Sequence, residues 1–378
     1  MRQRRFLLGA LLSLSLGLAV QAQTPSTLPV EIRIPGRTVA FRGSDGNVHL
    51  CYEATITNLD RKGRKLTVNR IDVLDDSKPT SAIGSFSGTE LEAILSHQGL
   101  PEPGAGARVI SGGMRASVWM WLSIDGTATP AAIRHRLTFS LETVEGERVV
   151  DCCFTTLDPP LVLLSAPLRG GNWAAANGPS NSSDHRRAVA TLNGQTRDGQ
   201  RFAIDWVRFG ENGKLTKTDG AANVDYYGYG QNVLAVADAA VADIKDGIPE
   251  NKPGSIDVPI DMGTIAGNFV VLDLGNGMYA GYAHLQPGSL RVKRGDRVHR
   301  GDVLGLLGNS GNSDAPHLHF QIMDAASILD SEGLPYLLES YTVMGISDKD
   351  DKYQPAKEPS DHKRELPLEN VVVLFVPR

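Results

Sequence analysis

Apolar and polar residues alternate over short stretches of the first part of the chain. Between Val48 and Ile56 every second residue is apolar, which places Leu50, Tyr52 and Ala54 with them on one face of an extended strand. Turn-forming residues separate this stretch from others of similar length, a pattern typical of antiparallel sheets. The other predicted strands span residues 30–34, 65–73, 117–124, 133–144 and 148–157. Their number and spacing predict an immunoglobulin-like β-sandwich.

The second part of the chain is also predicted to be mostly β, with shorter strands and more glycine. The run Asp158-Pro159-Pro160 breaks the pattern and indicates a domain boundary near residue 160. We therefore place the sandwich in residues 23–160 and a second domain in residues 161–345. Strands of this second domain are predicted at residues 202–207, 232–236, 268–274, 278–284, 303–307 and 317–323.

Residues 346–378 are predicted to form a polar tail. The chain becomes rich in charged residues from Ser347 on, which favours a solvated connection. The apolar run from Val371 to Val376 then predicts a terminal strand, with a partner-binding segment as the alternative.

The first 22 residues have the character of a secretory signal peptide. Arg2, Arg4 and Arg5 precede an apolar run from Phe6 to Val20. The run is followed by a small-residue cleavage site that ends at Ala22. The run is shorter than the roughly 20 residues that a membrane-spanning helix needs. We therefore expect export with cleavage, no membrane span afterwards, and a periplasmic, cell-envelope or extracellular location.

Composition narrows the partners and the redox chemistry. The formal net charge is −5 and no basic tract is present, which argues against binding to nucleic acid. The three cysteines, Cys51, Cys152 and Cys153, all lie in the predicted sandwich. In an oxidising compartment, one disulfide bridge from Cys51 to either Cys152 or Cys153 is possible.

The candidate chemistry lies in the second domain. In His317-Leu318-His319 the two imidazoles stand two residues apart on a strand, so both face one groove. Upstream, Ile204 and Trp206 share an apolar face while Asp205 points to the opposite side. A carboxylate and two imidazoles are thereby offered on the polar faces of strands.

A zinc site can be assembled from these residues and one more histidine. Turn signals between His185 and Asp205 allow the chain to fold back between them. Two imidazoles and one carboxylate, from His185, Asp205 and His319, would leave a fourth tetrahedral position open, as catalytic zinc requires. His284 and His317 then serve in proton transfer and oxyanion stabilisation, with His317 as the general base.

Other patterns carry no such prediction. No His-Glu-x-x-His sequence occurs, so the helix-borne zinc site of the large protease families is absent. We assign no metal role to His49, His135, His299 or His362. The glycine-rich loop of residues 308–314 is not followed by a helix pattern, and we interpret it as a groove wall.

The second domain resembles the lysostaphin-type (M23) zinc peptidases, which cut peptide cross-links of bacterial peptidoglycan. The resemblance spans roughly residues 220 to 323 and rests on the segments 229–236, 267–271, 282–285, 292–302 and 316–320. It implies an antiparallel β-sheet metallopeptidase domain of the lysostaphin (duplicated hybrid motif) type. It also implies that Asp205, His319 and His185 bind one Zn²⁺ and that His284 and His317 assist catalysis.

Two departures from the family pattern stand out. The family usually places its first histidine and aspartate four residues apart, whereas His185 and Asp205 are twenty apart. Gln321 replaces an acidic residue and Ala315 a glycine, changes that we expect to leave the ligands untouched.

The sequence therefore predicts an exported zinc endopeptidase that hydrolyses peptidoglycan cross-links by attack of a zinc-bound water. The alternative is an inactive relative that binds or activates cell-wall hydrolases. A lipoyl-like carrier is a third class, suggested by the Val292 to Gly301 repeat, but no lysine stands at a hairpin tip.

Overall fold

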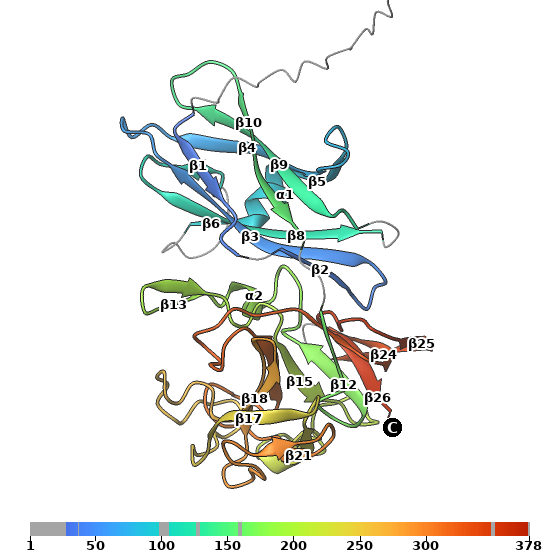
Figure 1. Cartoon of the computed structure of the whole chain (residues 1–378). Coiled ribbons are helices and arrows are strands. Elements are labelled where there is room, and N and C mark those ends of the chain that lie inside the picture. Colours follow the sequence, from blue (N-terminus) through green and yellow to red (C-terminus); the bar gives the residue numbers. More distant parts are fainter. Residues whose placement is uncertain are drawn as a thin grey trace, which may run out of the picture.

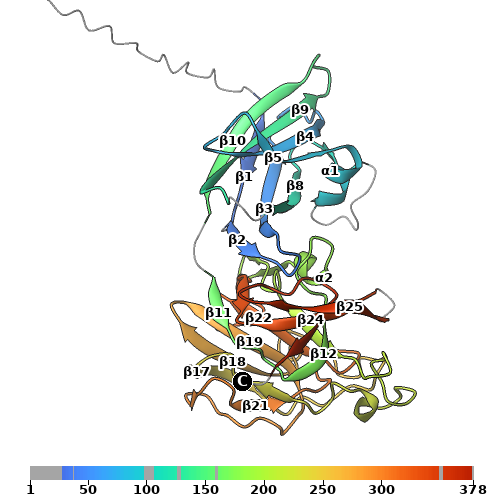
Figure 2. The same ribbon diagram turned by 90° about the vertical axis from the view of Figure 1, so that its right-hand side faces the viewer.

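The two predicted parts of the chain appear as two β-rich halves, one above the other in Figures 1 and 2. The predicted signal peptide lies outside the described residues. No helix in the described part of the chain has the length and apolar character that a membrane crossing requires. The computed structural model describes residues 28–36, 38–97, 106–125, 129–157, 161–348 and 352–376.

The first half contains two antiparallel sheets, each five-stranded within the described residues. One has the order β1-β3-β8-β6, with β2 also paired to β3, and the other has the order β10-β9-β4-β5, with β7 paired to β4. The strands of the first sheet are β1 (Val30–Arg33), β2 (Val39–Arg42), β3 (Val48–Asn58), β6 (Leu95–His97) and β8 (Arg115–Ile124). Those of the second are β4 (Leu66–Asp75), β5 (Ala82–Ser87), β7 (Val109–Ile110), β9 (Ala132–Leu141) and β10 (Arg148–Thr156), and helix α1 (Gly88–Ile94) follows β5.

Apolar residues of both sheets meet in one core. Leu50 and Ile56 of β3 pack in the same cluster as Val68 of β4 and Phe139 of β9, and all four are fully buried. The period-two pattern in the sequence selects this inward face, because alternate side chains of a strand point to opposite sides. The prediction of mostly β structure is confirmed, while the immunoglobulin-like topology stays a prediction.

The first five residues of strand β3 are buried on both faces, which the sequence pattern did not indicate. Its other face carries Cys51, which belongs to the main core cluster of the second half together with Phe41 of β2. Cys152 packs instead against the sandwich core. All three cysteines are free thiols, so the bridge from Cys51 is not formed. The thiol of Cys51 packs in the core cluster of the second half and not in the sandwich core.

The second half is built on one antiparallel sheet, ten-stranded in the described residues. Its order is β20-β17-β18-β19-β22-β15-β12-β26-β24-β25. In that order the strands span Arg297–Val298, Ala239–Lys245, Asn268–Gly275, Met278–Leu285, Leu318–Met323, Ile204–Arg208, Gly170–Ala176, Val371–Phe375, Tyr341–Ser347 and Tyr353–His362. The prediction of an antiparallel β-sheet domain is confirmed.

Short ladders and helical turns surround this sheet. The ladders pair β11 with β23, β13 with β14 and β16 with β21. These strands are β11 (Val162–Leu164), β13 (Ala190–Leu192), β14 (Gln195–Arg197), β16 (Asn232–Leu234), β21 (Val303–Leu306) and β23 (Tyr336–Leu338). The helical turns are α2 (Asp184–Arg187) and η1 (Asn223–Asp225).

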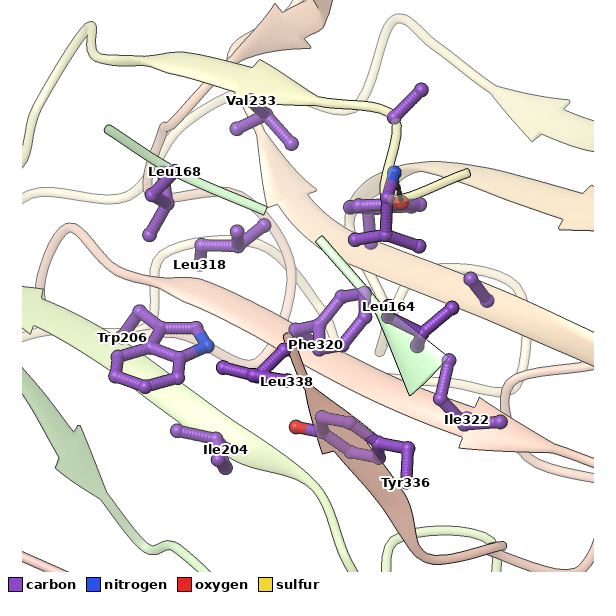
Figure 3. Close-up of a cluster of buried hydrophobic side chains, with 14 of the residues drawn as sticks. Leu164, Leu168, Ile204, Trp206, Val233, Leu318, Phe320, Ile322, Tyr336 and Leu338 are labelled. Carbon is purple, nitrogen blue, oxygen red and sulfur yellow. Dashed lines mark hydrogen bonds between the residues drawn. The ribbon is translucent and has the colours of Figure 1, made fainter. Parts of the chain in front are cut away.

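The core of the second half lies on one side of β15 and β22. Figure 3 shows Ile204, Trp206, Leu318 and Phe320 converging there with Tyr336 of β23, and all five are buried. Since neighbouring residues of a strand alternate sides, the residues between them project from the opposite face. The apolar face thereby fixes where the polar residues of the same strands must point.

The predicted polar tail does not form a separate solvated segment. Strand β24 crosses the expected boundary at residue 345, and β25 extends the sheet through residues that the sequence marked as a connection. An edge strand tolerates this composition, because one side of its backbone is unpaired: β25 contains Pro355 and Pro359 and is largely exposed. Strand β26, from Val371, lies inside the sheet between β12 and β24.

Candidate metal centre

Two neighbouring strands and one short helix bring three of the predicted residues together. In the ladder between β15 and β22, Asp205 lies directly opposite His319. Helix α2 adds His185, and one ligand atom from each of the three lies within 4.8 Å of the others. All three side chains are buried. The structure thus groups the three residues that the sequence selected as metal ligands.

The carboxylate of Asp205 lies at the centre of this group. Its Oδ1 is 2.9 Å from Nδ1 of His319 and 3.4 Å from Nε2 of His317, and its Oδ2 is 3.3 Å from Nε2 of His185. Asn177 donates a hydrogen bond from Nδ2 to Oδ2 at 3.0 Å. Burial alone would raise the pKa of Asp205, but the neighbouring histidines hold it well below its usual range. The group is therefore a carboxylate.

A buried glutamine determines which nitrogen of His319 carries the proton. Gln321 donates from Nε2 to the carbonyl oxygen of Ile328 at 3.0 Å, so its amide oxygen faces Nε2 of His319 at 2.7 Å. An amide oxygen only accepts, which places the proton of the neutral imidazole on Nε2. Nδ1 then presents a lone pair to Asp205. Two acceptors at 2.9 Å repel each other unless a proton or a cation lies between them.

His185 is held in the same way from its other nitrogen. Its Nδ1 donates to the carbonyl oxygen of Asn177 at 2.9 Å, so in the neutral ring Nε2 is the free acceptor that faces Asp205. Ser183 donates to the same carbonyl oxygen at 2.8 Å. Burial lowers the pKa of His185, against the opposing effect of Asp205, and so favours the neutral ring that metal coordination requires.

His284 and His317 form a second pair beside this group. Their ring centroids lie 4.7 Å apart, and the ring of His284 lies 5.8 Å from that of His319. Each Nδ1 contacts a backbone carbonyl oxygen, that of Ser310 at 2.7 Å for His284 and that of Ala315 at 2.9 Å for His317. In the neutral rings this leaves Nε2 without a proton on both.

The two rings have opposite protonation tendencies. Burial and the neighbouring His317 push the pKa of His284 well below its usual value. Burial opposes the charged form of His317 as well, but the adjacent Asp205 carboxylate outweighs it and raises that pKa. His317 is thus the ring in which a proton is better stabilised.

All five residues line one cavity of about 440 Å³. Its other walls include the apolar side chains Ile256, Ile265 and Leu329. The glycine-rich loop expected as a groove wall contributes Asn312, Ser313 and Asp314 to the lining. A cavity of this size with a few convergent polar groups is typical of a small-molecule or peptide-binding site.

The sequence analysis missed two residues of the centre. Gln321 was expected to leave the ligands untouched, and this is wrong, because it hydrogen-bonds His319. Its position two residues after His319, on the same face of β22, was the available signal. Asn177 contacts both His185 and Asp205 from a left-handed backbone conformation with φ of 46°, and no local pattern marked it.

Comparisons with known proteins place part of this half in a family. Residues 222–331 match Peptidase family M23, a range that includes His284, His317 and His319 but not His185 or Asp205. Endolysin 2638A of Staphylococcus phage 2638A is 34% identical over 113 residues, which cover 28% of this chain and 23% of the endolysin. The peptidoglycan DD-endopeptidase ShyA of Vibrio cholerae is 43% identical over 58 residues, 15% of this chain and 13% of that enzyme.

The chain matches less than a quarter of either relative's length. Among solved structures, the catalytic domain of lysostaphin from Staphylococcus simulans is 20% identical with a TM-score of 0.25, over 43% of this chain and 88% of that one. The assignment therefore rests on the sequence matches. Within its C-terminal half, this chain carries a segment, residues 222–331, that is similar to peptidase family M23.

Proposed function

We propose that this protein is an exported zinc-dependent endopeptidase that hydrolyses peptide cross-links of bacterial peptidoglycan. The observation that carries the proposal is the group of His185, Asp205 and His319, whose ligand atoms lie within 4.8 Å of one another at the wall of a cavity. The match of residues 222–331 to peptidase family M23 supports peptidase chemistry at this place.

The donor set fits zinc. Two imidazole nitrogens and one carboxylate oxygen are ligands that zinc takes in catalytic sites. The lone pair of His319 Nδ1 and the carboxylate of Asp205 face each other at 2.9 Å, a contact that a cation would make favourable. Zinc bound there would supply a Lewis acid that polarises the scissile carbonyl group and makes water a usable nucleophile near neutral pH.

The chain itself would move the proton. His317 can take a proton from water on Nε2, because Nδ1 already donates to the Ala315 carbonyl oxygen. The Asp205 carboxylate, 3.4 Å away, stabilises the resulting imidazolium. The protonated ring then donates to the leaving amine. His284 lies beside it and orients the water or the developing oxyanion.

The substrate class comes from the relatives. One is named an endolysin and another a peptidoglycan DD-endopeptidase, so peptides of the cell wall are the substrate we propose. Export through the predicted signal peptide would bring the enzyme to that polymer in the cell envelope. The cavity walls formed by Ile256, Ile265 and Leu329 would contact the apolar side chains of such peptides.

The proposal is tested by digestion of isolated peptidoglycan with the zinc-loaded protein, followed by mass spectrometry of the released fragments. We expect fragments with a new amino terminus from a cut cross-link. His319→Ala should lose both zinc and activity. His317→Ala should keep zinc and lose about 10²–10⁴-fold in turnover, the usual contribution of a general base.

The matched control is His299→Ala, which removes a histidine with 84% of its side chain exposed. It should digest peptidoglycan like the wild type. Release of no fragments by the zinc-loaded wild type would overturn the hydrolase proposal. Equal loss of zinc in His317→Ala would show that the two histidines do not have separate roles.

A further inference from the structure

The short helix that carries His185 contacts the first half of the chain as well as the second. Helix α2 has only four residues, and its N-cap residue Ser183 makes no side-chain capping bond. A helix this short is not stable by itself. In Figures 1 and 2 it lies at the surface of the second half that faces the first half. Its position must therefore come from tertiary contacts.

The residue next to His185 makes several of these contacts. Arg186 is fully buried and pairs with Glu53 of β3. It also donates from Nη2 to the Tyr52 carbonyl oxygen at 3.1 Å and lies 4.9 Å from the ring centre of Trp119 on β8. Both strands belong to the first half, so three groups of that half bind one side chain of α2.

Glu53 also links to the second half by another route. Arg201 donates to its two carboxylate oxygens at 3.0 and 2.8 Å. Burial would raise the pKa of Glu53, but Arg201 and Arg186 lower it to about 2, so the carboxylate is charged. A buried carboxylate between two guanidinium groups holds both in place, because an unpaired charge there would be strongly unfavourable.

The segment before α2 is attached at a further point. Asn181 donates from Nδ2 to the Trp119 carbonyl oxygen at 3.1 Å. The guanidinium group of Arg187, two residues after His185, lies 4.8 Å from the Trp119 ring centre. The first half therefore contacts the chain on both sides of His185, whereas Asp205 and His319 are fixed by the sheet.

We propose that the first half is a positioning element of the metal centre: Glu53 and Trp119 hold α2 through Arg186 and so set His185 against Asp205 and His319. His185 is twenty residues from Asp205 in the sequence and is not carried by β15 or its neighbours, so contacts outside the sheet must set its position. This inference rests on the proposed metal role of His185.

The test measures zinc affinity of the full chain, after metal removal, by competition with a chromophoric chelator. Glu53→Gln removes the charge with little change of shape and should weaken zinc binding about tenfold or more, the usual effect of losing support around a metal ligand. The control is Asp60→Asn, which breaks a similar buried carboxylate pair, with Arg64, inside the first half. It should leave the affinity unchanged.

A double-mutant cycle separates positioning from general structural damage. If Glu53 acts through His185, Glu53→Gln should weaken zinc binding in the wild type but have no further effect in a His185→Ala background. Binding of Co²⁺ to the same proteins gives a second readout, because its absorption spectrum changes when one ligand is lost. Asn181→Ala, a milder change at the same interface, should shift affinity in the same direction.

The outcomes are distinct. An unchanged affinity in both Glu53→Gln and Asn181→Ala would overturn the inference and leave the metal centre intact. An equal loss with and without His185 would also overturn it, because Glu53 would then act elsewhere. If the wild type binds no zinc, the proposed function and this inference both fail.

Discussion

Each histidine of the centre is oriented by a partner on the nitrogen that faces away from Asp205. For His185 the partner is the Asn177 carbonyl oxygen, and for His319 it is the amide oxygen of Gln321. These partners fix the protonated nitrogen and so determine which lone pair is available to a metal. Gln321 has no exposed surface and also binds the Ile328 carbonyl oxygen, so it cannot rotate freely.

We expect Gln321→Leu to weaken zinc binding by about 10-fold or more, because His319 loses the acceptor that fixes its tautomer. Gln321→Glu keeps an acceptor at the same place and should retain the affinity. The measurement is chelator competition on purified protein. Gln195→Leu, at an exposed position of β14, serves as the control. Wild-type affinity in Gln321→Leu would contradict the role of this side chain.

At the scale of elements, the loop that contains Gly267 and the loop that contains Gly311 contact each other next to His284. His284 is the second-last residue of strand β19. It has a left-handed φ of 62°, a strained conformation for a histidine. One loop accepts its backbone N–H at the Ala266 carbonyl oxygen, and the other accepts its Nδ1 proton at Ser310. Gly311 has φ of 78°, and a Cβ there would lie 2.3 Å from the backbone nitrogen of Gly267.

Gly311→Ala should therefore lower turnover while leaving zinc affinity near that of the wild type, since the loops position His284 and not the three proposed ligands. The matched control is Gly277→Ala, with φ of 72° but open space around the position. The control should lose only the roughly 1–2 kcal/mol of a left-handed alanine. Steady-state kinetics measure the turnover of both variants, and urea unfolding measures their stability. Equal turnover and equal stability of Gly311→Ala and Gly277→Ala would contradict the role of the loop contact.

At the scale of the whole molecule, buried charges join the two halves. Glu53 pairs with Arg186 and Arg201, and Asp198 lies within 3.3 Å of Arg186. The two carboxyl groups respond differently to pH. Arginine neighbours outweigh burial and lower the pKa of Glu53 to about 2, whereas burial raises the pKa of Asp198 to about 7.

The pH dependence of stability follows from these directions. The pKa of Glu53 is lower in the folded state than its ordinary value of 4.5, so its contribution is complete above pH 4.5 and is lost as pH falls toward 2. A shift of this size corresponds to on the order of 3 kcal/mol. The free energy of unfolding of the wild type should exceed that of Glu53→Gln most near pH 5 and converge with it near pH 2.

Urea titrations of both proteins at several pH values between 5 and 2 measure this difference. A gap that stays constant over the acid range would show that the Glu53 carboxylate is not stabilised by folding. Asp198 acts in the opposite sense, because its raised pKa makes the folded state less favourable as pH rises from 3.8 toward 7. Both proteins contain Asp198, so the comparison uses the difference between their unfolding free energies and not either pH curve alone.

Local patterns in the sequence determined the β class and much of the centre. The alternation around Ile204 and Leu318 fixes one apolar face on each strand, so Asp205 and His319 must point to the other side. This follows from the two-residue period of a strand, which is a property of neighbouring residues alone. The same reasoning predicted that His317 and His319 line one groove, and both line the cavity.

Only the tertiary structure decided how His185 reaches Asp205 and what holds it there. Helix α2 is too short to produce a helical period of apolar residues in the sequence. Its partners Glu53 and Trp119 lie more than sixty residues earlier in the chain. The second buried face of β3 was hidden for the same reason. Contacts between distant segments depend on how complete sheets pack against each other, and no local period of apolar residues encodes that packing.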